Sequence, residues 1–171
     1  EKKRKIGEND DEICKLIRND LVVDFIKYVN KNNYPLSSQI KKSTYETNSY
    51  LNHQKQTLSE YAAFFGSIQI FNYLIHNNIE LTSSLWIYAI HSNNPELIHI
   101  LENNQIRLDK ETYEACIIES IKCHYFEISK YFINMNLVDT NQIVNFKILQ
   151  KYNLVLLNEK IDEILEEIEE Y

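Results

Sequence analysis

The most regular feature of the chain is an apolar pattern that recurs four times. It occupies residues 25–29, 70–74, 97–101 and 128–132, and each copy is followed by a short polar stretch that contains asparagine. Within each copy, apolar residues stand at positions i, i+3 and i+4, which places them on one face of a helix. Successive copies are offset by roughly 45, 27 and 31 residues, within the range of helical repeats. We therefore predict four helices that end at asparagine, a residue that tolerates the left-handed conformation.

A second, shorter helical pattern precedes each of the last three copies. Thr57 and Glu60 have the spacing of a capping box, in which each side chain binds the other residue's backbone N–H. Gly66 is suited to end the helix that they begin. Asp109 precedes another helix, which we predict over residues 111–121 with acidic residues in its first turn.

The helix between these two is predicted over residues 85–90. Ser83 or Ser84 can cap its N-terminus. Asn94 followed by Pro95 indicates the start of the next helix, with asparagine as the N-cap and proline in the first turn.

Each unit thus consists of a helix, a short turn, a second helix and a loop. One such pair cannot bury its apolar face alone, so neighbouring units must stack and share a core. The chain has only two Gly and two Pro, whereas sandwiches and barrels need many turn residues. We predict an all-α helical repeat solenoid of about four helix-turn-helix units over residues 10–140. Ala62, Ala63 and Ala89 would allow the units to approach closely.

The ends of the chain depart from this repeat. Residues 36–56 break the period and are predicted as an irregular insert, and residues 1–9 as a disordered basic tail. Residues 141–171 are predicted as a C-terminal helical cap with an acidic end. Its apolar stripe would cover the open end of the stack, and a protruding coiled-coil seam is the alternative. The stripe consists of Ile161, Ile164, Leu165 and Ile168.

Residues 57–66 read Thr-Leu-Ser-Glu-Tyr-Ala-Ala-Phe-Phe-Gly, which resembles the T-P-L-H-x-A-A-x-x-G signature of an ankyrin repeat. More broadly, residues 13–106 resemble a protozoan family of ankyrin-like repeat domains whose function is unknown. The resemblance is carried by residues 43–48, 57–74 and 84–91. Leu58 and Glu60 replace the proline and histidine of the signature, and the spacing of about 27 residues is shorter than the usual 33. We therefore expect short or absent β-hairpin fingers.

This resemblance implies a scaffold that binds a partner protein on its concave face. In ankyrin repeats, the two variable positions between the alanine pair and the glycine point into that groove. Here those positions fall on Phe64, Phe65, His91, Ser92, Lys122 and Cys123. An aromatic pair at helical spacing also fits a core, so at least one of the two phenylalanines has that alternative role.

The net charge bears on the class of partner, and the cysteine content bears on the location in the cell. A net charge of −7 disfavours nucleic acid, which needs clustered Lys and Arg, and the basic run at residues 2–5 lies in the expected tail. No apolar run approaches the length of a membrane span, so we expect no membrane insertion. Three cysteines, an odd number without C-x-x-C spacing, favour reduced thiols and an intracellular, cytoplasmic location.

Residues for catalysis do not form a recognisable pattern. The five histidines include no H-E-x-x-H, and the Cys and His spacings match no zinc site. A phosphate-binding loop needs several glycines, and the chain has only Gly7 and Gly66. Cys123 and His124 are neighbours in sequence and point apart on a helix, which does not suit a nucleophile–base pair. We predict no enzyme activity, no metal and no cofactor.

Three hypotheses about function follow. The first is a protein-interaction module, an adaptor or scaffold that acts as a monomer. The second is a structural or self-assembling element that uses the ends of the stack or the acidic C-terminal helix. The third is an enzyme or small-ligand binder without a familiar motif. A concentration-dependent oligomer would favour the second, and a deep polar pocket would favour the third.

Overall fold

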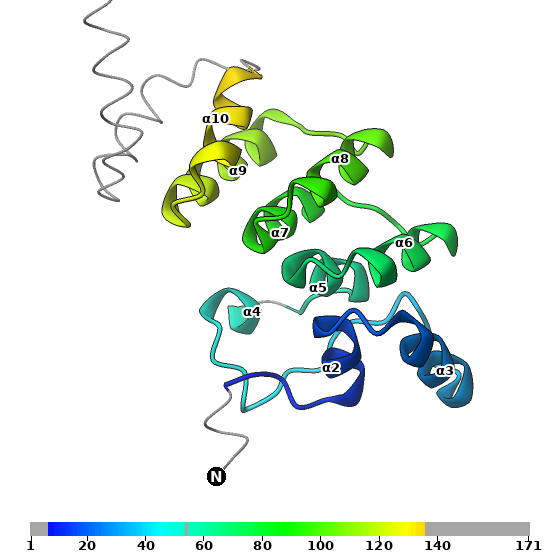
Figure 1. Ribbon diagram of the computed structural model, residues 1–171. Coiled ribbons are helices and arrows are strands. Elements are labelled where there is room, and N and C mark those ends of the chain that lie inside the picture. Colours follow the sequence, from blue (N-terminus) through cyan, green and yellow to red (C-terminus); the bar gives the residue numbers. More distant parts are fainter. Residues whose placement is uncertain (1–6, 54, 136–171) are drawn as a thin grey trace, which may run out of the picture. The chain divides into compact units, whose positions relative to one another are not determined.

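A computed structural model describes residues 7–53 and 55–135, and every regular element within them is a helix (Figure 1). The predicted all-α class is therefore confirmed. The chain divides into two compact units, Glu1–Ile106 and Arg107–Tyr171. The helices of the first are α2 (Glu12–Arg18), α3 (Val22–Asn32), α4 (Ser49–His53), α5 (Leu58–Phe65), α6 (Ile68–His76), α7 (Leu85–Ser92) and α8 (Pro95–Asn103); those of the second are α9 (Lys110–Lys122) and α10 (Phe126–Asn134).

The first unit contains three helix hairpins, α2–α3, α5–α6 and α7–α8 (Figure 1). The first helices of successive hairpins pack on one another, α2 on α5 and α5 on α7, and α3 packs on α6. Each hairpin thereby buries its apolar face against its neighbour, as the repeat pattern requires. Side chains with no exposed surface fill the interface, among them Ile17, Phe25, Leu58, Ile70, Phe71, Leu74, Leu85 and Leu97.

The turn inside each hairpin is built around one residue with a positive φ. Gly66 takes φ 70° between α5 and α6, and Asn93 takes φ 50° between α7 and α8. Asp20 and His124 do the same in α2–α3 and α9–α10, with φ of 49° and 58°. Side chains other than glycine adopt this conformation rarely, with Asp, Asn and His enriched among those that do. The repeat is thus visible in the backbone as well as in the apolar pattern.

The second helices of the first unit end in the same way. Asn33 after α3 and Asn78 after α6 have φ of 46° and 55°, which confirms the predicted use of asparagine as a helix stop. After α8 the residue with positive φ is Gln105, at 52°, one position beyond the asparagine at the end of the helix. The asparagine that follows the fourth copy lies outside the described residues.

Most of the predicted helix starts are confirmed. The Thr57 hydroxyl accepts from the backbone N–H of Glu60 at 3.2 Å, and the Glu60 carboxylate accepts from the N–H of Thr57 at 2.8 Å. Asn94 accepts from the N–H of Glu96, with Pro95 in the first turn. Asp109 accepts from the N–H of Thr112 at 2.8 Å. These bonds satisfy N–H groups that have no partner inside the helix.

The predicted serine cap of α7 is wrong. Ser84 is the residue before the helix, but its backbone is already helical and its side chain makes no capping hydrogen bond. Its hydroxyl instead donates to the Glu60 carboxylate at 2.6 Å. A helical φ and ψ turn the side chain away from the first N–H groups, since a capping residue needs an extended backbone. Ser84 therefore links the N-termini of α5 and α7.

The predicted insert is irregular over residues 36–48 and then forms the short helix α4. Its two ends are joined by an isolated antiparallel bridge between Gln39 and Thr57, where the N–H of Ile40 donates to the carbonyl of Gln56 at 2.7 Å. Both the N–H and the hydroxyl of Thr47 donate to the carbonyl of Gly7. Residues 1–6 of the expected tail and residues 141–171 of the expected C-terminal cap, including its apolar stripe, lie outside the described residues.

The described part of the second unit contains α9 and α10, which pack on each other. The Tyr113 hydroxyl donates to the backbone carbonyl of Phe132, and both side chains are fully buried. The Ser129 hydroxyl donates to that of Ser120 at 3.0 Å. The two polar contacts fix the register of one helix on the other within an apolar core, because an unmade bond there would leave a buried polar group unsatisfied.

Asp20 joins the first hairpin to the second. Its two carboxylate oxygens accept from the N–H groups of Gln69 and Ile70, at 3.0 and 2.9 Å, in the first turn of α6. The residue at the N-cap of α6, Ser67, does not cap the helix with its side chain. Its hydroxyl donates instead to the carbonyl of Ile17 in α2. The cap of α6 therefore comes from the neighbouring hairpin.

We predict that Asp20→Ala lowers the free energy of unfolding by about 2 kcal/mol. This is the upper end of the range for a lost helix cap, because alanine also disfavours the positive φ at this position. Asp20→Asn should lose less, because the amide oxygen still accepts and asparagine tolerates this backbone. Asp20→Gly should fall between them, since it removes the cap without strain. Urea unfolding followed by circular dichroism measures all three, and equal stability of Asp20→Gly and wild type would contradict the capping role.

Candidate functional site

Aromatic side chains gather where the C-terminal ends of α5 and α7 pack together. The Phe64 and His91 rings are stacked with centroids 4.9 Å apart, and the Phe64 and Phe65 rings meet edge to face at 5.1 Å. We call Phe64, Phe65, Tyr88 and His91 the aromatic patch. Three of its members, Phe64, Phe65 and His91, are predicted partner-binding residues, and Tyr88 is an addition from the structure.

Small residues bring the two helices this close. Ala62, Ala63 and Ala89 are fully buried between packed helices, as the sequence pattern predicted. The turn after α5 also lies against the turn after α7. A Cβ on Gly66 would stand 3.5 Å from the Cβ of Ser92, so glycine is needed there for its φ of 70° rather than for space.

The two phenylalanines of the patch differ in exposure. Phe64 is only 9% exposed and belongs to the core, which is the alternative that the helical spacing left open for one of the pair. Phe65 is half-buried. Its ring packs on Tyr61 at 4.8 Å and lies 5.9 Å from the Arg18 guanidinium carbon. Phe65 is therefore the phenylalanine that a partner can reach.

Arg18 supports this side of the patch from α2. Its Nη1 donates to the Tyr61 hydroxyl and to the backbone carbonyl of Asn9, each at 2.9 Å. Its Nε forms an ion pair with Glu8 at 3.1 Å. Burial raises the pKa of Tyr61 well above its usual range, so the hydroxyl stays neutral at physiological pH. The network holds the guanidinium beside Phe65 in one orientation.

Tyr50, like Tyr88, is a residue of this surface that the sequence did not reveal. It lies on α4, and its ring is parallel to that of Phe64 at 6.0 Å, edge to face with Tyr88 at 5.3 Å, and 4.2 Å from that of His91. The insert has no repeat that would assign it a partner. One signal was available in the sequence. Asn48 is a residue that can cap a helix, and the apolar residues Tyr50 and Leu51 follow it closely, which indicates a short helix that packs on the hairpins.

Ser92, another predicted contact residue, serves the turn between α7 and α8. Its hydroxyl donates to the carbonyl of Ala89 at 2.7 Å and accepts from the N–H of Asn94 at 3.2 Å. Both bonds are local to the turn.

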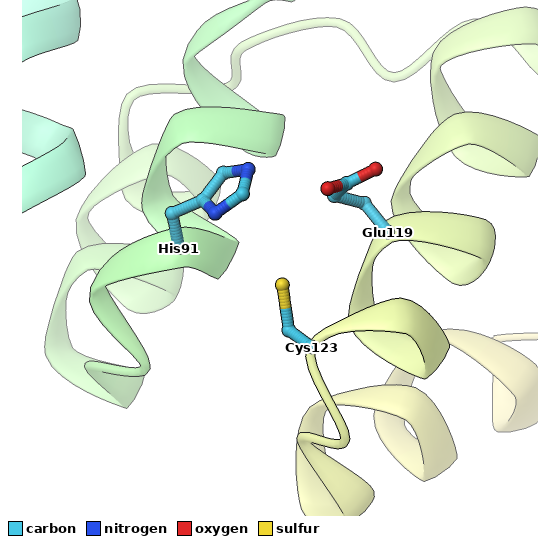
Figure 2. A group of neighbouring side chains, drawn as sticks. All are labelled: His91, Glu119 and Cys123. Atoms are coloured by element: carbon cyan, nitrogen blue, oxygen red, sulfur yellow. The ribbon is translucent and has the colours of Figure 1, made fainter. Parts of the chain in front are cut away.

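Lys122 and Cys123, the last two predicted contact residues, belong to the second unit. Lys122 is exposed and pairs with Glu119 at 2.9 Å. Cys123 follows the last turn of α9 and leaves that helix on the same side as Glu119 (Figure 2). Figure 2 also labels His91 on α7 of the first unit. An exposed ion pair between residues one helical turn apart contributes less than about 1 kcal/mol, so the Lys122 ammonium can exchange Glu119 for another partner at little cost.

Burial governs the chemistry of the three cysteines. Cys14 and Cys116 have no exposed surface and pack in the core as small apolar residues. Burial raises the pKa of the Cys14 thiol to about 12 and that of Cys116 further, and it raises that of the half-buried Cys123 to about 11. Since the thiolate is the reactive form, all three thiols are held in their unreactive state at neutral pH.

Comparisons with known proteins do not add to this geometry. No family model matches the chain, and neither the curated proteins nor the solved structures include a match to it. Among the residues that the structure describes, no helix combines the length and the apolar character needed to cross a bilayer.

We predict an order of thiol reactivity: Cys123 reacts first and Cys116 last. A raised pKa means that the folded protein keeps its thiols protonated at pH 8, while an unfolded chain begins to ionise there. Labelling with iodoacetamide at pH 8, followed by peptide mass spectrometry, measures each site, with labelling in concentrated urea as the control. Equal rates for Cys116 in the folded and unfolded chain would contradict its burial.

Proposed function

We propose that this protein is an interaction module that binds a partner protein on the surface formed by α5 and α7. The observation that carries this proposal is the aromatic patch, placed on the successive first helices of stacked hairpins. An ankyrin-like arrangement of these hairpins is part of the proposal. It is supported by the repeated left-handed turn residues and by the packing of α2 on α5 and of α5 on α7.

Helical repeats suit this role because stacking creates an extended surface whose members repeat at fixed intervals. Aromatic and arginine side chains are enriched among the residues that dominate protein interfaces. Phe65 is half-buried, so its ring is held against its neighbours and still presents part of its surface. Arg18 is held beside Phe65 by three polar contacts. Binding would therefore immobilise little that is not already ordered.

Self-assembly is the second candidate, and one observation favours it. Leu21 and Val23 are large apolar residues with 46% and 62% of their surface exposed, and both stand at the start of α3. This position belongs to the first hairpin. Two exposed apolar side chains there suit contact with a second copy of the chain.

We expect Phe65→Glu to reduce capture of the partner roughly thirtyfold, which corresponds to about 2 kcal/mol for an interface hot spot. Tagged wild-type protein is used to capture proteins from a lysate of cells that naturally make this chain, and the bound proteins are quantified by mass spectrometry. Phe65 suits this test better than Phe64, because a charge at the buried Phe64 would unfold the hairpin. Circular dichroism verifies that each variant is folded.

Val23→Glu is the matched control, since it introduces the same charge at an exposed position on α3. Proteins that are lost with Phe65→Glu and retained with Val23→Glu are partners of the α5–α7 surface. If both variants recover the wild-type set, the proposed surface is wrong. If sedimentation shows a wild-type oligomer that dissociates with Val23→Glu and not with Phe65→Glu, self-assembly replaces the adaptor proposal.

A further inference from the structure

Part of the aromatic patch is already occupied by a segment of the same chain. The ring of Tyr50 lies against three of its four members, Phe64, Tyr88 and His91. Phe64 is 9% exposed in the presence of this cover. The surface that we propose for a partner is therefore the surface on which α4 rests.

The contact between α4 and the hairpins is local. The helix has five residues, too few to be stable by itself. Within the described part of the first unit, its backbone does not pack extensively on any other helix. Tyr50 contacts the patch with its side chain, and Ser49 and Asn52 on the same helix are exposed. A segment held in this way opens at much lower cost than a helix of the stack.

Hydrogen bonds within the insert stabilise α4. The side-chain oxygen of Asn48 accepts from the N–H groups of Tyr50 and Leu51, at 2.9 and 3.3 Å, and thereby caps the helix. The Asn52 amide donates to the carbonyl of Glu46 at 2.7 Å. These bonds stabilise α4, and the ring of Tyr50 joins the helix to the aromatic patch.

The insert has attachments that do not depend on α4. Its ends are joined by the hydrogen bond from Ile40 to Gln56, and Thr47 is bonded to Gly7. Leu51, on α4 itself, is 4% exposed and lines a small cavity together with Ile40 of the insert and Tyr61 of α5. The helices α5 and α7 are joined to each other by their own packing and by Ser84 and Glu60. Tyr50 can therefore leave the patch without any hairpin coming apart.

We propose that α4 is an intramolecular competitor of the partner, and that the partner displaces it by placing an aromatic side chain where Tyr50 now lies. This inference rests on the proposed function and specifies the chemistry of the partner. The site between Phe64, Tyr88 and His91 accepts a flat ring, with one stacked and one edge-to-face neighbour. Because Tyr50 is tethered, it competes at a high effective concentration, and the uncovered protein binds the same partner more tightly.

The test uses a phage-displayed library of random peptides, selected on the full chain carrying Tyr50→Ala. We expect the selected peptides to contain Phe, Tyr or Trp at a constant position. One selected peptide, labelled with a fluorophore, is then titrated by fluorescence anisotropy. Its affinity for Tyr50→Ala should exceed its affinity for wild type about tenfold. This factor corresponds to the free energy of one or two aromatic ring contacts, which the peptide no longer has to displace.

Asn48→Ala is a second variant that opens the same surface by another route. It removes the cap of α4 and leaves the ring of Tyr50 and all of the hairpins unchanged. If Tyr50→Ala does not fold, Asn48→Ala tests whether α4 competes with the partner. Its affinity for the peptide should lie between those of wild type and Tyr50→Ala. Tyr28→Ala is the matched control, because Tyr28 lies on α3, where its ring contacts Tyr34. It should bind the peptide as wild type does.

Each other outcome overturns the competitor role. Weaker binding by Tyr50→Ala would make Tyr50 a contact residue for the partner, and equal binding by all variants would make α4 a neutral part of the fold. A library that yields no aromatic peptide on Tyr50→Ala would show that the uncovered surface takes no such ligand. The proposed function is judged separately, since Phe65→Glu reduces partner capture if that function is right, whatever α4 does.

Discussion

The close packing of α5 on α7 is the contact on which the first unit depends. A helix hairpin of about twenty residues cannot bury its apolar side alone, so each hairpin needs the next one to complete its core. Ala62, Ala63 and Ala89 make the approach close, because alanine adds no bulk between the helix backbones. The hydrogen bond from Ser84 to Glu60 then fixes the two N-termini in register. At the C-termini the same approach brings together the side chains of the aromatic patch.

The left-handed residues in the hairpin turns make this packing possible. A chain that reverses between two helices within two or three residues needs a positive φ, and here Asp20, Gly66 and Asn93 provide it in the first unit. Asp20 does more, since its carboxylate caps α6 in the neighbouring hairpin. One residue thus sets the turn of its own repeat and the position of the next. Such coupling makes the hairpins cooperative rather than independent.

The insert between the first two hairpins has a different character. It lacks the repeat, it is rich in polar residues, and it forms one short helix whose aromatic side chain rests on the patch. A surface that binds partners is exposed apolar surface in the absence of the partner, with the risk of aggregation that this carries. If α4 acts as the intramolecular competitor that we propose, it reduces that risk and raises the affinity that a partner needs in order to bind. The same proposal implies a preference for partners that present an aromatic ring.

The sequence by itself determined the helical class, the positions of the hairpins and most of their caps, because these depend on residues close together in the chain. Helical spacing of apolar residues, the capping box at Thr57 and the Asn94–Pro95 start are all local signals. It could not decide that Ser84 bonds to Glu60 rather than capping α7, that Asp20 caps α6, or which phenylalanine of the pair lies in the core. Nor could it place Tyr50 on Phe64 and His91. Each of these contacts joins residues from different helices, and only the packing of the whole unit selects one partner among several that local chemistry allows.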